Sequence, residues 1–172
     1  MQEEDIAIVM KEIQLTQGKV ALIDDEDYEK LNQFKWYAHR TKTWYAARGV
    51  WINGKNKSKK FRMHREIMNT PTHLQIDHIN GNTLDNRKEN LRICTNQQNG
   101  FNKKNPLKNN KLGIKGVCWH KKIKKFMASI KINDKSIHLG YFNVLGDADS
   151  AYRIAELKYF GEFARQFDKY EF

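Results

Sequence analysis

Residues 75–92 read "QIDHINGNTLDNRKENLR", and this stretch decides how the middle of the chain folds. It holds an adjacent Asp77-His78 pair, an Asn-Gly turn signal and four asparagines, with few apolar residues among them. "HLQIDHI" and "LRICT", which overlap its two ends, have the composition of short strands. We therefore expect two strands joined by a polar loop at residues 79–90, followed by a short helix at "NQQNGFN".

The Asp77-His78 pair has the chemistry that phosphodiester hydrolysis needs: a base to activate water, and hard oxygen ligands for a divalent cation. The unperturbed pKa of a histidine is about 6.5, near neutrality. An isolated Asp-His pair is usually a hydrogen-bonded loop pair, so it is a weak signal alone. Strand alternation also places the two side chains on opposite faces, so both reach one metal only if the strand ends or twists there.

Several spaced elements around this pair resemble the ββα-metal, or HNH, nuclease motif, in the variant whose last histidine is an asparagine. The matching stretches are "IDHINGN", "DNRKENLR" and "TNQQNGFN", with "MHREIM" just upstream. A leading segment similar to that of phage- and intron-borne HNH endonucleases extends the match over residues 12–102. The resemblance implies His78 as general base, and Asp77 and Asn99 as ligands of one Mg²⁺ (or Mn²⁺) per active site. It implies that Asn90 orients His78 or ties the loop together.

Each of these roles has a structural alternative. Asn90 could simply cap the turn, and Asn99 could lie on a helix surface. Arg87 and Arg92 could contact DNA phosphates or anchor the loop through nearby acids. We expect His64, in "MHREIM", to be structural or close to DNA rather than catalytic.

The charge of the chain is unevenly distributed. The formal net charge is +11; residues 31–62 carry nine bases and no acid, and residues 101–135 carry eleven lysines and one aspartate. Residues 63–100, between them, have four of each sign. Such an excess favours a polyanionic partner, most often nucleic acid. We expect double-stranded DNA, while RNA shares the charge pattern and stays an alternative.

The C-terminal part has a simpler pattern. "GIKGVCWHKK", "KFMASIKIN" and "KSIHLGYF" predict three strands, and "DADSAYRIAELKYFGEF" predicts an amphipathic helix that ends at Gly161. Apolar and polar residues alternate along the second strand, so one sheet face should be buried. The stretches "KFMASIK", "LGYF" and "AYRIAELKYFGEFA" resemble the AP2 DNA-binding domain. That resemblance implies a sheet in the major groove with the helix behind it.

The two resemblances and the lysine cluster together define a set of expected DNA-contact residues. Plant AP2 domains usually have arginines at the positions that correspond to Cys118, His120 and Ser136 of this chain. Because Arg is the best bidentate reader of guanine, we expect weaker base readout here and salt-sensitive phosphate contacts from lysines. The alternative to DNA contact is a basic sheet that only faces solvent. The expected DNA-contact residues are Arg87, Arg92, Lys115, His120, Lys121, Lys122, Lys124, Lys125, Ser129, Lys131 and His138.

We thus expect an α+β protein with a nuclease domain at 1–104, whose ββα-metal core lies at about 72–102, a linker at 105–111 and an AP2-like domain at 112–172. The expected function is that of a homing-type DNA endonuclease; the alternative is a non-catalytic DNA-binding regulator that retains the HNH scaffold. No apolar run approaches the roughly 20 residues of a membrane span. We expect action in the cytoplasm of a bacterial or phage-infected cell, by a monomer or a homodimer.

Overall fold

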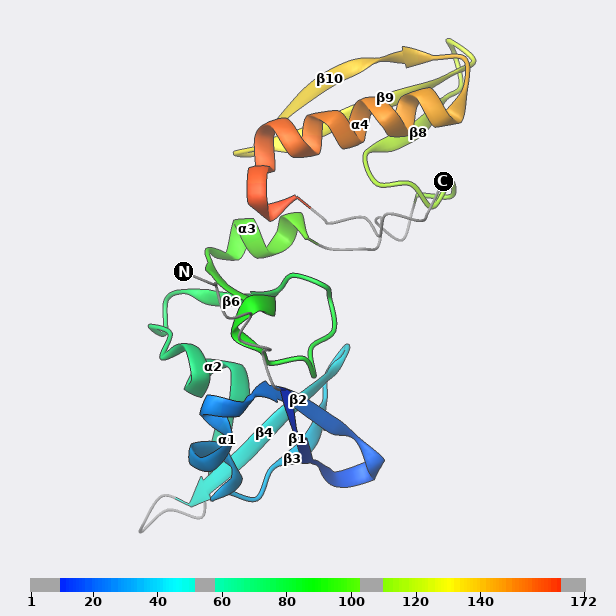
Figure 1. Ribbon diagram of the computed structural model, residues 1–172. Coiled ribbons are helices and arrows are strands. Elements are labelled where there is room, and N and C mark those ends of the chain that lie inside the picture. The colour runs from blue at the N-terminus through cyan, green and yellow to red at the C-terminus, as the bar shows by residue number, and fades with distance from the viewer. Residues whose placement is uncertain (1–9, 52–57, 103–109, 165–172) are drawn as a thin grey trace, which may run out of the picture. The chain divides into compact units, whose positions relative to one another are not determined.

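The computed structural model describes residues 10–51, 58–102 and 110–164 (Figure 1). The chain divides into two compact units, Met1–Asn96 and Gln97–Phe172, called unit 1 and unit 2 below. Both contain small antiparallel sheets with few helices, in agreement with the α+β prediction. Most of the predicted linker, at 103–109, lies outside the described residues, so its bounds stay a prediction. Within the described ranges, no helix has both the length and the apolarity to span a membrane.

Unit 1 begins with a hairpin and a helix. Strand β1 (Met10–Gln14) pairs antiparallel with β2 (Val20–Asp24) across the short 3-10 helix η1 (Thr16–Gly18). Helix α1 (Asp25–Asn32) follows, and its first turn is acidic, which complements the partial positive charge of a helix N-terminus. The strands and helix agree with the predicted lead segment.

A second sheet and a short helix complete the core of unit 1. The strands β3 (Tyr37–Arg40), β4 (Trp44–Trp51) and β5 (Ser58–Arg62) are antiparallel, with β4 in the centre. Helix α2 (Met63–Met68) follows β5 directly. The side chains buried in this core are Ile13, Leu15, Ala21, Ile23, Leu31, Trp36, Ala38, Ala46 and Met63.

Residues 75–94 form the predicted strand–loop–strand. Strand β6 (Gln75–His78) pairs antiparallel with β7 (Leu91–Cys94), and the 3-10 helix η2 (Lys88–Asn90) immediately precedes β7. Helix α3 (Asn96–Phe101) then starts at the last residue of unit 1 and continues in unit 2.

Unit 2 is a three-stranded antiparallel sheet with one long helix. The strands β8 (Val117–His120), β9 (Lys125–Ile132) and β10 (Lys135–Phe142) follow the order β10-β9-β8. Helix α4 (Leu145–Phe160) ends at Gly161, as predicted, and the 3-10 helix η3 (Gly161–Phe163) follows it. The core between sheet and helix buries Val117, Ala128, Ile130, Ala148, Tyr152, Ala155, Phe160 and Ala164. One face of β9 is therefore buried, as its alternation predicts.

Candidate active site

Strand β6 ends at the Asp77-His78 pair. Asp77 is opposite Arg92 and His78 is opposite Leu91 in the β6–β7 register. The amide of Gly81 donates to the His78 carbonyl at 2.9 Å, and the φ of +76° at Gly81 suits a glycine in this turn. Both members of the pair are buried, with 6% and 5% of their surface exposed. Strand β6 thus ends directly after the pair, and both residues lie within it.

Asp77 is held by the neighbouring strand. The Nη2 and Nε atoms of Arg92 donate to its Oδ2 at 2.6 and 2.9 Å. The exposed fractions of the two side chains are only 11% and 7%, so this is a charge pair in a poorly hydrated setting. Arg92, which was predicted to contact DNA, is therefore paired with Asp77, the predicted metal ligand.

His78 is surrounded by polar groups of its own loop. Burial lowers the pKa of His78 below its usual value, while the nearby Asn86 side chain and the carboxylates of Asp77 and Asp85 oppose that change. Since burial is the largest effect, the imidazole is neutral at neutral pH. A neutral imidazole is the form that can accept a proton.

A second buried histidine lies beside His78. The ring of His64, on α2, is edge-on to that of His78, with centroids 5.1 Å apart and an interplanar angle of 90°. Tyr45 on β4 approaches both rings, at 5.6 and 6.2 Å. Burial, followed by the charges of His78, Arg62 and Arg65, lowers the pKa of His64 to about 3. The sequence predicted that His64 is structural or close to DNA rather than catalytic, and "MHREIM", which contains it, was the available signal.

Asn90 ties the two ends of the polar loop together. Its Oδ1 accepts from the Asn80 amide at 2.9 Å, and its Nδ2 donates to the Asp85 carbonyl at 2.8 Å. Its own carbonyl accepts from the Ile79 amide at 2.9 Å. Asn90 is 5% exposed. These bonds fix the loop on which His78 depends.

Asp85 organises the middle of the same loop. Arg87 donates to both of its carboxylate oxygens, at 2.9 and 2.8 Å, and the Asn80 side chain donates at 2.9 Å. The pKa of Asp85 is lowered, because these hydrogen bonds outweigh its burial. Hydrogen bonding to Asp85 raises the pKa of Arg87. Arg87 also pairs with Glu89 at 2.6 Å, so in this structure it anchors the loop.

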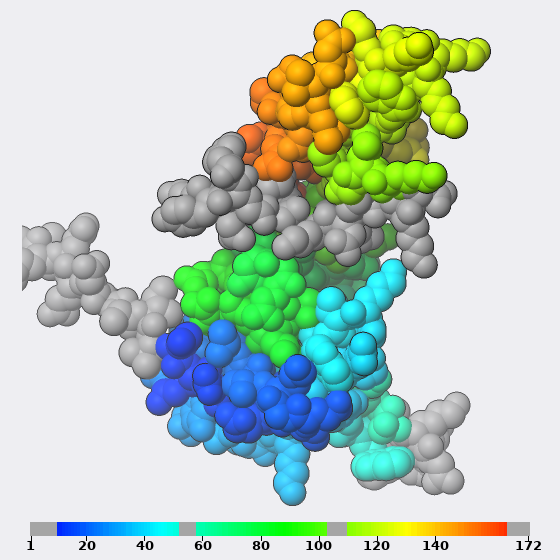
Figure 2. Space-filling view, turned by 90° about the vertical axis from the view of Figure 1, so that its right-hand side faces the viewer, coloured from blue at the N-terminus to red at the C-terminus, as the bar shows by residue number. Residues whose placement is uncertain are grey.

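The lead segment of unit 1 holds the loop from outside. The amide of Leu22 on β2 donates to the Leu84 carbonyl at 2.9 Å, and the Leu22 carbonyl accepts from the Asn86 amide at 2.7 Å. The hydroxyl of Thr83 donates to the Trp44 carbonyl. In Figure 2 the N-terminal residues, in blue, lie directly against the green residues of the middle of the chain. The lead segment therefore supports the loop rather than forming an independent part.

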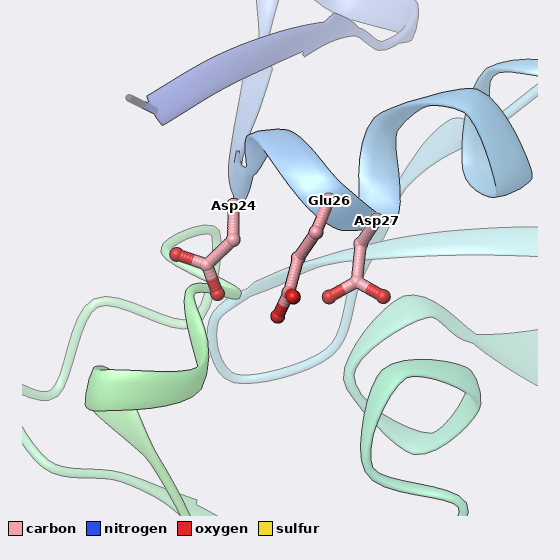
Figure 3. A group of neighbouring side chains, drawn as sticks. All are labelled: Asp24, Glu26 and Asp27. Carbon is pink, nitrogen blue, oxygen red and sulfur yellow. The ribbon is translucent and has the colours of Figure 1, made fainter. Parts of the chain in front are cut away.

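Three acids at the start of α1 extend this contact. The carboxylates of Asp24, Glu26 and Asp27 lie within 4.8 Å of one another and point to the same side (Figure 3). Lys88 on η2 contacts all three: its Nζ lies 2.5 Å from Glu26 and 3.2 Å from Asp27, and its amide donates to Asp24 at 2.7 Å. The cluster is thus explained by an attachment of the loop, and this attachment raises the pKa of Lys88.

The predicted DNA-contact residues of unit 2 fall into two groups. The register pairs Lys131 with Ser136, Ser129 with His138, and His120 with Lys125, all on the sheet face opposite α4. Lys121, Lys122 and Lys124 are exposed in the β8–β9 turn.

Lys115 belongs to neither group, because its ammonium is engaged inside unit 2. The Nζ of Lys115 donates to the Phe101 carbonyl and to the Glu156 carboxylate, both at 2.7 Å. The Glu156 side chain is only 2% exposed.

Asn99, the predicted second metal ligand, lies on α3 in the part of that helix that belongs to unit 2.

Comparisons with known proteins identify the family. The family model described as HNH endonuclease matches residues 37–101. An uncharacterized HNH endonuclease of Acanthamoeba polyphaga mimivirus is 27% identical over 153 residues, which cover 86% of this chain and 74% of the relative. Protein 3.8 of Escherichia phage T7 is 32% identical over 95 residues, which cover 55% of this chain and 77% of the relative. No solved structure matches. The chain belongs to the HNH endonuclease family and is a nuclease.

Proposed function

We propose that this nuclease is a metal-dependent DNA endonuclease of the homing type that hydrolyses phosphodiester bonds to 5′-phosphate and 3′-hydroxyl ends. The observation that carries this proposal is the buried Asp77-His78 pair at the end of β6, on a loop fixed from several sides. The family acts on DNA. Its homing character rests on the resemblance to phage- and intron-borne enzymes.

His78 is the proposed general base. Its pKa is lowered by burial, so the imidazole is ready to take the proton from an attacking water at neutral pH. Asn90 acts indirectly, since its hydrogen bonds to Asn80 and Asp85 hold the loop that follows His78. Any change in the loop would move the base relative to the scissile phosphate.

HNH nucleases generally use a divalent metal ion, and Asp77 and Asn99 are the proposed ligands of one Mg²⁺ or Mn²⁺ per active site. A carboxylate and an amide supply the oxygen atoms that such hard cations prefer. Asp77 supplies such a carboxylate at the end of β6, and in this structure its Oδ2 atom pairs with Arg92. When bound, the ion would stabilise the negative charge that develops on the phosphate and the leaving 3′-oxygen. Asparagine donates less strongly than the histidine of the more common version, so we expect modest metal affinity.

Removal of the metal should abolish cleavage. Supercoiled plasmid incubated with the protein and Mg²⁺ should be converted to relaxed circles or linear molecules, and excess EDTA should stop the conversion. Adding Mg²⁺ or Mn²⁺ above the EDTA concentration should restore it. Relaxed circles would indicate nicking by one site, whereas linear product would indicate cleavage of both strands by a dimer. Cleavage that persists in EDTA would contradict the metal-dependent mechanism.

The alternative, a non-catalytic regulator on an HNH scaffold, makes a different prediction in the same experiment. It would bind the plasmid in a gel-shift assay and leave it uncut at every metal concentration. A labelled single-stranded RNA of the same sequence, tested in parallel, separates a DNA enzyme from one that prefers RNA.

We further propose that unit 2 is an AP2-like module that holds the enzyme on double-stranded DNA. Its sheet is backed by α4, and the face opposite that helix carries His120, Ser129, Lys131 and His138. These polar side chains would face the groove, while the β8–β9 turn would supply phosphate contacts. Lys115 is left out of the direct contacts, because its ammonium is paired with Glu156.

The lysines in the β8–β9 turn and at the start of β9 should set the salt dependence of binding. We expect the change of Lys121, Lys122, Lys124 and Lys125 to glutamine to reduce the slope of log K against log salt by about 0.9 for each lysine that contacts a phosphate. Lys122→Gln alone can be compared with Lys158→Gln, which removes the same charge from an exposed position on α4. An unchanged slope for the fourfold variant, measured by fluorescence anisotropy between low and physiological salt, would rule out phosphate contacts by this turn.

A further inference from the structure

We propose that His64 is a positioning residue that fixes the orientation of the His78 ring through direct ring packing. This inference rests on the proposed role of His78 as general base. It concerns a residue of α2 that lies outside the strand–loop–strand and whose own ring is 4% exposed.

Two aromatic rings, those of His64 and Tyr45, lie against the His78 ring and restrict its rotation. His64 presents a perpendicular ring at a centroid distance of 5.1 Å, which is the preferred edge-to-face arrangement of aromatic pairs. Tyr45 lies 5.6 Å from His64 and 6.2 Å from His78, so it supports both. The guanidinium of Arg62 lies over the Tyr45 ring, 4.8 Å from its centroid. A base held in this way keeps its orientation when substrate arrives.

Helix α2 is itself anchored firmly enough to serve as a reference point. Glu66 accepts from Arg48 on β4 at 2.7 and 3.0 Å. Arg65 donates to the carbonyls of Thr70, Pro71 and Leu74, in the segment that leads into β6, and the bond to Leu74 is 2.6 Å long. The helix that carries His64 is therefore tied both to the central sheet and to the strand that carries His78.

Ring packing, rather than a hydrogen bond from its Nδ1 atom, is what His64 contributes. Among the described residues, the buried Nδ1 atom of His64 has no hydrogen-bond partner. A buried polar atom without a hydrogen bond usually costs stability. A hydrogen bond from Nδ1 is therefore not the reason why a histidine occupies position 64. Its low pKa, about 3, keeps the ring neutral and places no charge beside His78.

The test compares His64→Ala with His64→Phe in the full-length protein. His64→Ala removes the ring, and we expect kcat for plasmid cleavage to fall about ten- to a hundredfold, since small misplacements of a catalytic group cost up to about a hundredfold. The dissociation constant for DNA should stay within twofold. His64→Phe keeps an aromatic ring, so kcat should return to within about threefold of the wild-type value, with unchanged or increased thermal stability.

Met63→Ala serves as the matched control for general destabilisation. Met63 is fully buried on the same helix and packs into the core of unit 1, so its loss should lower the melting temperature. At a temperature where all variants are folded, kcat of Met63→Ala should match the wild type. If Met63→Ala and His64→Ala lose kcat equally, His64 has only a structural role and the proposal is wrong.

Other outcomes also overturn the proposal. If His64→Ala cleaves at the wild-type rate, or if His64→Phe is as impaired as His64→Ala, ring packing does not position His78. These failures differ from a failure of the proposed function, in which wild type itself would not cleave or a His78 variant would cleave normally. The ¹³C resonances of the His78 ring provide a second readout, because they should shift in His64→Ala and stay close to their wild-type positions in Met63→Ala.

Discussion

His78→Ala should lower the rate of plasmid cleavage by about 10²- to 10⁴-fold, the usual contribution of a general base. The imidazole is neutral because burial lowers its pKa, and the Asp77 and Asp85 carboxylates beside it would stabilise the protonated ring that proton transfer produces. Alanine removes the acceptor and leaves the acidic residues in place. DNA affinity should change little, since His78 is only 5% exposed. The measurement is the single-turnover rate on supercoiled plasmid with Mg²⁺.

Two further variants separate lost chemistry from lost folding in this experiment. His78→Gln keeps a polar side chain of similar length and should be as inactive as His78→Ala while preserving more of the packing. His73→Ala removes an exposed histidine just before β6 and should cleave like wild type. Wild-type rates for His78→Ala would exclude His78 as the base. Equal losses in His73→Ala would show that the effect is not specific to the site.

Gly116→Ala should destabilise unit 2 by about 2–5 kcal/mol, the sum of an unfavourable backbone conformation and a steric clash. Gly116 has a φ of +73°, where an L side chain costs about 1–2 kcal/mol. A Cβ there would lie 2.0 Å from two carbons of the Tyr152 ring and 2.8 Å from the Ser129 carbonyl oxygen. Tyr152 is buried between sheet and helix, so the ring would have to leave its place in the core.

Gly113→Ala is the matched control for this prediction. Gly113 has nearly the same φ, +72°, but a Cβ there would meet nothing within 4 Å. It should lose only the backbone contribution of about 1–2 kcal/mol. Amide hydrogen exchange in β9 during a urea titration reports on unit 2, and amides of β4 report on unit 1 as an internal reference. Equal losses for the two variants would show that the contact with Tyr152 does not limit this position.

The local pattern of residues 75–92 was enough to predict the strand–loop–strand, because strand propensity and turn signals act over short distances. The same holds for unit 2, where alternation along β9 and the helical spacing of α4 correctly predicted a buried sheet face. The HNH resemblance identified the nuclease family by the same means. The proposed roles of Asp77, His78, Asn90 and Asn99 remain predictions that the experiments above test.

Contacts between distant residues could not be predicted in this way. His64 and His78 lie in different elements, and only the folding of α2 against β6 and β7 brings their rings together. Lys115 was expected to face DNA because of its place in a basic segment, yet its ammonium pairs with Glu156, 41 residues along the chain. Lys88 likewise meets the acids of α1, which belong to the lead segment.

The sequence by itself therefore predicted which residues could carry out hydrolysis and which elements they lie on, and its charge indicated a polyanionic partner. These properties depend on residue type and short-range spacing. Only the tertiary structure decided which charges are already paired, such as Arg92 with Asp77, and which side chains surround the proposed base. The physical reason is that burial and hydrogen bonding determine the charge state and orientation of a side chain, and both depend on residues far apart in the chain.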